Sequence, residues 1–374
     1  RVPRTYRNRV FIIDSGKTEN EQREMGSAEQ KLYYGGDILK ELGQTFKYDS
    51  TDGTVEVIEP GKDEGNTSRI CKNLLTSGVY AAWAFKVNYT GELQGTYRVL
   101  EEIPDGMELA YIRIKWHGDA ARNIVSSKDI TGLDEEWKRE RNLTTTDRQE
   151  SNQETIYYVN KNGKQALIEL GEFTAGKIVD DYSVDVQVVC RVTDKNVLLG
   201  GEQKTFTNKV TLQNADGTKN ISTATANATL SDNNLTKKNN LTDESNYTMS
   251  ASSTSQRLTY TITANARGQQ LLTGDGEKLT IVDKLGDNLS LVGDSFSAKN
   301  LQNNTSVNIK TKYDPETKII EIEIPDKTPV EITYSATVDV APDTGKKVNV
   351  TNEVYWKSYS AGGGATNTIK NYSY

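Results

Sequence analysis

The chain contains an internal repeat in which five short segments recur in one order. The first copy runs through ICK (70–72), VYAAWAFKVN (79–88), VLEEIPDG (99–106), YSVDVQVVCRVT (182–193) and TFTNKVTL (205–212). The second copy runs through LTK (235–237), LTYTITAN (258–265), IVDKLGDN (281–288), VEITYSATVDV (330–340) and NVTNEVYW (349–356). Similarity of this extent indicates two copies of one folding unit, with the differences in length placed in loops.

The repeated segments have the composition and the alternation of β-strands. They are rich in Val, Ile, Thr and Tyr, and DG pairs at 52–53 and 216–217 supply turn signals between such segments. Helical patterns are short and limited to 37–43 and 132–142, while 19–34 is ambiguous. Because strands do not alternate with helices, we predict an all-β chain of antiparallel β-sandwiches with a few short helices in loops.

The repeat also predicts the domain boundaries. We place the first sandwich at 66–230 and the second at 231–374. Residues 1–65 are either the end of a preceding unit or an N-terminal extension. TYRNRVFI (5–12) is similar to TFTNKVTL, and a preceding unit would make the chain a piece of a longer tandem array. The alternative is a chance match of T-x-x-N-x-V in a chain rich in Thr and Asn.

The composition excludes several classes of function. The single histidine, His117, and the two cysteines, Cys71 and Cys190, cannot form a zinc site without carboxylates, and the sequence has no cofactor-binding motif. A net charge of −7 argues against a nucleic-acid-binding protein. No apolar run is long enough to span a membrane, and no signal peptide is recognisable. An enzyme is therefore the weaker expectation.

Each copy carries a lysine, a carboxylic acid and an asparagine at matching places. The lysine stands two residues after an aliphatic residue, so the two side chains share one face of a strand. The acid begins an acid-x-aliphatic step at a strand end, and the asparagine lies in a T-N-x-V segment. The six residues are Lys72, Glu101 and Asn208 in the first copy and Lys237, Asp283 and Asn352 in the second.

The choice of two of these residues depends on their neighbours. Lys237 is followed by Lys238, and strand parity from Leu235 favours Lys237. Glu101 is followed by Glu102, and the spacing to the Ile-Pro step favours Glu101.

These three residue types can react with one another inside a sandwich core. Burial lowers the pKa of a lysine and raises that of a carboxylic acid, so the amine becomes a nucleophile and the acid a hydrogen-bond donor. The acid can then polarise the carboxamide, the amine attacks it, and ammonia leaves. Folding supplies the proximity that makes such an encounter fast. The product is a Lys–Asn isopeptide bond.

Two segments of the second copy carry a resemblance to a known family. LTIVDKLGDNL (279–289) and VNVTNEVYW (348–356) resemble the collagen-adhesin and fibrillar-adhesin sandwiches of Gram-positive bacterial surfaces. Those modules are variants of the immunoglobulin fold and often carry autocatalytic Lys–Asn isopeptide bonds. The resemblance implies that Lys237 is the amine, Asp283 the assisting acid and Asn352 the acceptor.

In the first copy the resemblance implies the same roles for Lys72, Glu101 and Asn208. It also implies a non-enzymatic, extracellular adhesin or stalk fragment on the bacterial cell surface, anchored to the cell wall through a part outside this sequence. The implied partners are neighbouring domains of a longer surface protein. Neither a cofactor, nor a nucleic acid, nor membrane insertion is implied.

Other interpretations stay open on the sequence alone. The lysines could be solvated, with Asp283 and Asn352 serving turns. The fragment could itself bind a host extracellular-matrix protein or glycan, between its domains or through 107–160. A carbohydrate-active sandwich would use paired carboxylates such as Glu101 and Asp283, although these occupy equivalent places in different repeats. A disulfide between Cys71 and Cys190 is a further alternative.

Overall fold

The structure is a computed structural model of the 374-residue chain. It describes residues 4–12, 23–32, 38–60, 70–88, 93–116, 129–144, 153–173, 184–241, 247–249, 255–272, 278–339, 347–359 and 362–371. His117 lies outside these residues.

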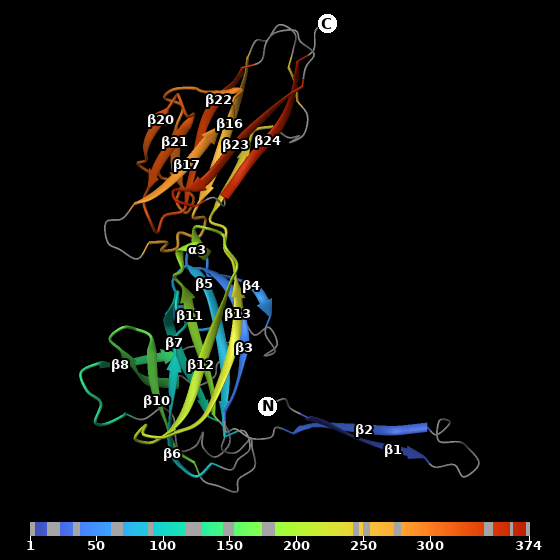
Figure 1. Ribbon diagram of the computed structural model, residues 1–374, viewed down its shortest axis with the longest axis vertical. Helices are drawn as coiled ribbons and strands as arrows, with labels where there is room; N and C mark the ends of the chain where they lie inside the picture. The colour runs from blue at the N-terminus through green and yellow to red at the C-terminus, as the bar shows by residue number, and fades with distance from the viewer. Residues whose placement is uncertain are drawn as a thin grey trace.

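The first sandwich consists of two antiparallel sheets (Figure 1). One has the order β4-β3-β5-β11-β7, formed by β4 (Thr54–Pro60), β3 (Ile38–Asp49), β5 (Gly78–Val87), β11 (Val184–Val192) and β7 (Met107–Trp116). The other has the order β13-β12-β6-β10-β9-β8, formed by β13 (Asn220–Leu230), β12 (Lys204–Asn214), β6 (Gly95–Glu102), β10 (Gln165–Phe173), β9 (Gln153–Asn160) and β8 (Trp137–Thr144). Their facing sides bury one apolar core.

The second sandwich also consists of two sheets, which are antiparallel except for one parallel pair at the edge of the larger sheet. Its smaller sheet contains β14 (Leu235–Asn239), β16 (Ser255–Ala264), β22 (Val330–Asp339) and β18 (Leu289–Leu291) in that order, with β19 (Ser297–Asn300) also paired to β22. Its larger sheet has the order β15-β24-β23-β17-β21-β20, formed by β15 (Tyr247–Met249), β24 (Gly362–Asn371), β23 (Lys347–Trp356), β17 (Leu279–Leu285), β21 (Ile319–Ile324) and β20 (Lys310–Asp314). The predicted all-β fold of tandem antiparallel sandwiches is confirmed.

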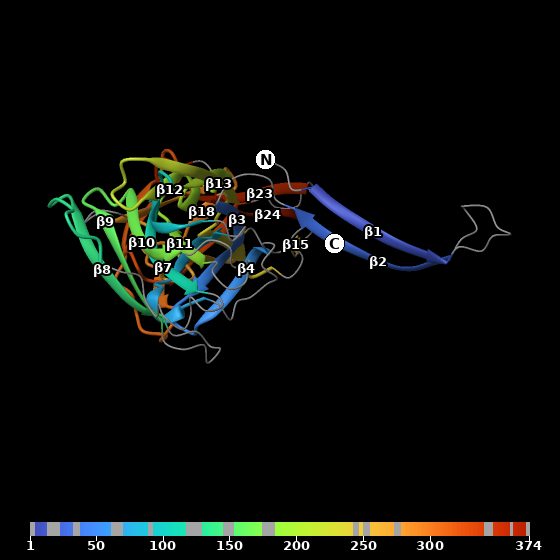
Figure 2. The same cartoon turned by 90° about the horizontal axis from the view of Figure 1, so that it is seen from below.

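A separate hairpin stands apart from both sandwiches. β1 (Arg4–Ile12) and β2 (Arg23–Leu32) pair only with each other among the strands that the structure describes. The hairpin projects sideways from the first sandwich in both views (Figures 1 and 2). In the described ranges, no helix has the length and apolar character that crossing a bilayer requires.

Period-two alternation explains how the strands form the cores. In β22, Val330, Ile332, Tyr334, Ala336 and Val338 are all buried. The residues between them are more exposed, apart from a buried serine, so one face of the strand is apolar and turns inward. The DG turns at 52–53 and 216–217 join β3 to β4 and β12 to β13, and both glycines adopt positive φ, as tight turns require.

Three sequence predictions about local structure are wrong. The segment 37–43, expected as a helix, lies mostly in strand β3, and most of 132–142 lies in strand β8. In both cases cross-strand pairing overrides a weak helical pattern. The first sandwich also begins before residue 66, because β3 and β4 (38–60) are strands of its smaller sheet.

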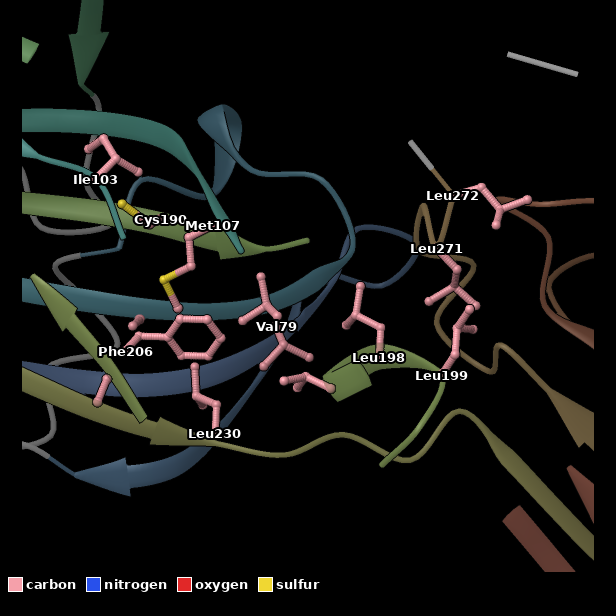
Figure 3. Close-up of a cluster of buried hydrophobic side chains, with 14 of the residues drawn as sticks. Val79, Ile103, Met107, Cys190, Leu198, Leu199, Phe206, Leu230, Leu271 and Leu272 are labelled. Carbon is pink, nitrogen blue, oxygen red and sulfur yellow. The ribbon is translucent and has the colours of Figure 1, made fainter. Parts of the chain in front are cut away.

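The two sandwiches share a packed junction. Leu198 and Leu199, at the end of helix α3 (Lys195–Leu198), belong to the same buried cluster as Leu271 and Leu272 of the second sandwich. Figure 3 shows these leucines between the two domains. The core is therefore continuous from one sandwich into the next.

A buried carboxylate ties the linker to both domains. Asp232, between β13 and β14, accepts hydrogen bonds from Arg267 at 2.7 and 2.8 Å and from Gln269 at 2.9 Å, both in the second sandwich. Lys47 of β3 forms an ion pair with it at 3.5 Å, from the first sandwich. Asn234 links Asp232 to the carbonyl oxygen of Leu198.

Removing this carboxylate is expected to loosen the junction. Asp232→Ala leaves the largely buried Arg267 without its anion, so we expect a loss of about 3 kcal/mol in the free energy of unfolding. Small-angle scattering should show a broader distribution of molecular lengths. Asp105→Ala, whose side chain is 96% exposed, is the control. An unchanged scattering profile in Asp232→Ala would show that the apolar contact alone fixes the junction.

Candidate crosslinking sites in the two sandwich cores

The two sandwiches place three strands in equivalent positions. In the smaller sheets, β3 and β14 are followed by β5 and β16, and then by β11 and β22. In the larger sheets, β12 and β23 lie between a hairpin partner (β13 or β24) and an inner strand (β6 or β17). A lysine on β14, an acid on β17 and an asparagine on β23 therefore have counterparts on β3, β6 and β12.

The register of the acid and asparagine strands is the same in both domains. Glu101 pairs with Val210, two residues after Asn208. Asp283 pairs with Val354, two residues after Asn352. A two-residue offset keeps both side chains on one face of the sheet, so each acid lies beside its asparagine and faces the core.

In the second sandwich the structure brings the three expected residues into contact. Lys237 Nζ forms a short ion pair with Asp283 Oδ2 and donates a hydrogen bond to Asn352 Oδ1 at 2.6 Å. The side chains of Lys237 and Asp283 are fully buried, and Asn352 is 0% exposed. Lys238 is exposed, so the strand places Lys237 and not its neighbour inside.

A tyrosine that sequence reasoning missed completes this cluster. The Tyr334 hydroxyl accepts hydrogen bonds from Lys237 Nζ and Asn352 Nδ2 and donates one to Asp283 Oδ2, each at 2.8 Å. A hydroxyl can make all three bonds at once. The available signal was a phenol among the apolar residues that alternate along 330–338.

Burial sets the protonation balance of the second site. Desolvation lowers the pKa of Lys237 to about 8, against the opposing effect of the Asp283 charge. Desolvation raises the pKa of Asp283, against the effect of Lys237. The cost of moving the proton from the ammonium to the carboxylate is therefore smaller than in water. That transfer gives a neutral amine beside a protonated acid.

A glycine lets the lysine strand approach β24. A Cβ atom on Gly363 would lie 2.9 Å from the Lys237 backbone nitrogen and 2.9 Å from Thr236 Cα. Real Cβ atoms do not come so close to backbone atoms, so a larger residue here would displace β14. Gly363 therefore contributes to the position of Lys237.

In the first sandwich the amine beside the acid is Lys40. Lys40 Nζ lies 3.3 and 3.2 Å from the two carboxylate oxygens of Glu101, and both side chains are fully buried. Lys40 pairs with Phe85 on β5, and its ammonium lies 4.9 Å from the centre of that ring. Lys40 on β3 thus occupies the place of Lys237 on β14.

The expectation that Lys72 lies on a strand beside Glu101 is wrong. Lys72 begins a 3₁₀ turn (Lys72–Leu74) between β4 and β5, and the amine that contacts Glu101 comes from Lys40. The pattern that selected Lys72, an aliphatic residue two positions before a lysine, also occurs at Ile38 and Lys40. A helix over 37–43, as the sequence predicts, would keep Ile38 and Lys40 out of the set of strand residues.

The asparagine of the first site is oriented differently. Asn208 is 0% exposed, and its Nδ2 donates to the backbone oxygen of Glu102 at 3.0 Å. Its Oδ1 is buried and has no hydrogen-bond partner among the residues described. By register, the position of Tyr334 corresponds to Val188, which offers no hydroxyl. The first site therefore lacks the group that joins the three side chains in the second.

Burial also shifts both ionisable groups of the first site. Desolvation lowers the pKa of Lys40 and raises that of Glu101, and in each case the charge of the other residue opposes the shift. Glu102, by contrast, is partly exposed and pairs with Lys209 at 2.6 Å. The structure thus places Glu101, and not Glu102, in the core.

Neither the Cys71–Cys190 disulfide nor a catalytic pair of Glu101 and Asp283 is present in the structure. Cys71 and Cys190 are buried in two different apolar clusters and do not form a disulfide with each other. Glu101 and Asp283 lie in the cores of different sandwiches. They are therefore not the facing pair of carboxylates that hydrolysis of a glycoside uses.

Comparisons with known proteins give distant likenesses in structure. No family model and no curated protein sequence matches the chain. The C-terminal domain of the Streptococcus agalactiae AgI/II polypeptide BspA has a TM-score of 0.31 and 11% identity over 90% of this chain and 100% of that one. The Staphylococcus aureus collagen adhesin has a TM-score of 0.25 and 12% identity over 79% of this chain and 88% of that one.

Proposed function

We propose that the chain is a non-enzymatic segment of an extracellular adhesin or stalk, whose two sandwiches are stapled by autocatalytic Lys–Asn isopeptide bonds. The observation that carries the proposal is the buried contact of Lys237, Asp283 and Asn352. An unreacted lysine and acid are costly to bury, and bond formation turns the amine into a neutral amide. The proposed location is a bacterial cell surface, where another part of the protein is anchored to the cell wall.

In the second sandwich the reaction balances without any added reagent. Asp283 takes a proton from Lys237, and the neutral Nζ attacks Cγ of Asn352. Protonated Asp283 gives its proton to the leaving amide nitrogen and takes the second proton from Nζ, and the Cγ–Nδ2 bond breaks. The products are a Nζ–Cγ amide bond with one N–H, one molecule of ammonia and protonated Asp283, which returns to the carboxylate when it passes its proton to the departing ammonia.

In the first sandwich Lys40 takes the role of the amine in place of Lys72. Glu101 is the acid and Asn208 the acceptor, as the repeat suggests. Before reaction the Asn208 carboxamide must turn from the Glu102 carbonyl toward Lys40. We therefore expect this bond to form more slowly than the Lys237–Asn352 bond.

The placement of the proposed bonds suits a chain under tension. The second bond joins β14, the first strand of its sandwich, to β23, the next-to-last strand. Force applied to the two ends of the domain would be carried by the bond and would bypass the 115 residues of sequence separation between Lys237 and Asn352.

In single-molecule pulling, about 400 Å of extension would be absent from the second domain. Full extension of that segment would contradict the proposal.

The Tyr334 hydroxyl is expected to speed bond formation. Tyr334→Phe removes the hydrogen bonds to Lys237, Asp283 and Asn352 while keeping the ring. After refolding, the mass shift of the second sandwich should appear about tenfold more slowly, since positioned hydrogen-bond donors commonly contribute at least that much. Tyr313→Phe is the control, because Tyr313 lies on β20, at the edge of the larger sheet and two strands away from β17. Equal rates in the two variants would remove Tyr334 from the mechanism.

Binding of a host matrix protein by this segment is the alternative within the same class. Solid-phase binding of the purified chain to collagen and other matrix proteins distinguishes a stalk segment from a segment that itself binds a matrix protein. A stalk segment gives no saturable binding. Saturable binding would assign the adhesive role to these domains themselves.

A further inference from the structure

The hairpin β1–β2 has the same register as the last hairpin of each sandwich. Asn208 pairs with Ala226 in β12–β13, and Asn352 pairs with Ala365 in β23–β24. In β1–β2 the residue opposite Asn8 is Ala28. An asparagine facing an alanine therefore recurs in three antiparallel hairpins.

The similarity extends along both strands of the hairpin. Four residues before each asparagine, the paired residue on the second strand is aliphatic: Leu32 opposite Arg4, Leu230 opposite Lys204, and Ile369 opposite Val348. The second strand also has a small residue two positions before its alanine, namely Gly26, Ala224 or Gly363. In the second sandwich this is the position where the lysine strand comes close.

The first strand repeats the apolar pattern around the asparagine. In the two sandwiches, the residues at −2, +2 and +4 from Asn208 and Asn352 are apolar and buried: Phe206, Val210 and Leu212, and Val350, Val354 and Trp356. At the same offsets from Asn8 stand Tyr6, Val10 and Ile12. Asn8 thus shares a strand face with three residues typical of a sandwich core.

The order of elements indicates which polypeptide completes this hairpin. Ala226 precedes the next lysine of a sandwich by 237 − 226 = 11 residues, and Ala28 precedes Lys40 by 40 − 28 = 12. In this chain β12–β13 closes the sandwich before it and leads into the lysine strand β14 of the next. β1–β2 leads in the same way into β3, while both described sandwiches already have a terminal hairpin of their own.

We infer that β1–β2 is the terminal hairpin of a third sandwich, whose other strands lie N-terminal to it in the same polypeptide, and that Asn8 is the acceptor of a Lys–Asn bond there. The lysine and acid would come from the preceding segment, and the reaction would release one ammonia from Asn8. The bond rests on the chemistry proposed above for Asn352. The hairpin assignment rests on register and sequence alone.

Peptide mapping of the full-length protein from its native cells tests the inference. Cleavage after glutamate leaves Asn8 in a peptide that ends at Glu19. We expect this peptide to be joined to a lysine-containing peptide from outside residues 1–374, with the combined mass short by one ammonia. In an Asn8→Ala protein the joined peptide should disappear, while the joined peptides of Asn208 and Asn352 remain.

The same digest separates the failure of this inference from the failure of the proposed function. A linear Asn8 peptide beside joined Asn208 and Asn352 peptides would overturn the role of Asn8 and leave the proposed function intact. Linear peptides at all three asparagines would overturn both. A joined Asn8 peptide whose partner belongs to a second polypeptide, seen as added mass on a denaturing gel, would overturn the assignment to a preceding segment.

Discussion

Replacing Asn352 by alanine is expected to raise the intact mass of the chain by one ammonia relative to the crosslinked form, after allowance for the substitution, and to lower its melting temperature sharply. The proposed bond closes a loop of 352 − 237 = 115 residues. By the chain-entropy argument used for disulfides, losing it costs about 5 kcal/mol, which corresponds to about 10–20 °C for a domain of this size. Mass spectrometry measures the change in mass, and calorimetry measures the melting temperature of the second sandwich.

The control for this variant is Lys238→Ala. Lys238 is the exposed neighbour of Lys237, so its removal should change neither the mass deficit nor the melting temperature. Asp283→Ala should also abolish the deficit, since it removes the group that moves the proton. A melting temperature that falls in Asn352→Ala without any change in the mass deficit would assign the effect to lost packing and not to a bond.

Replacing Lys40 by methionine is expected to abolish the crosslink of the first sandwich. The proposed bond there closes a loop of 208 − 40 = 168 residues, so its loss also costs about 5 kcal/mol and about 10–20 °C in the first transition. Methionine has an unbranched side chain like that of lysine, and it lacks the amine. The mass deficit should fall from two ammonia molecules to one.

The matched control distinguishes the two candidate lysines of the first domain. Lys72→Met should keep the full deficit of two ammonia molecules, because Lys72 lies in the 3₁₀ turn and Lys40 holds the contact with Glu101. Asn208→Ala, which leaves the Lys40–Glu101 pair in place, should reproduce the mass of Lys40→Met. A deficit that is lost in Lys72→Met and kept in Lys40→Met would reverse the assignment.

Most of the fold could be predicted from the sequence because the strands carry clear alternation. The residues from Val330 to Val338 show why: their period-two pattern indicates both the strand and its buried face. The segment around Lys40 was harder. DILKELG has a helix-like composition, and only its pairing with β4 and β5 makes it a strand. A helix at 37–43 also moves the predicted start of the first sandwich to residue 66 and makes Lys72 its predicted lysine, where the structure has β3 and Lys40.

The second site was predictable to the extent that its residues occupy regular strands. Parity selected Lys237, and the repeat selected Asp283 and Asn352, which the structure brings together. Tyr334 was not predictable as a member, because its contact with the other three depends on how the two sheets face each other. The orientation of the Asn208 carboxamide, whose Nδ2 donates to the backbone oxygen of Glu102, depends on the same packing and could not be predicted from the sequence.

The intact mass of the purified chain under reducing conditions tests the central claim most directly. If both sandwiches close their bonds, the measured mass falls below the sequence mass by two ammonia molecules. A mass that equals the sequence mass would contradict the account, because it would leave both buried lysines as free amines.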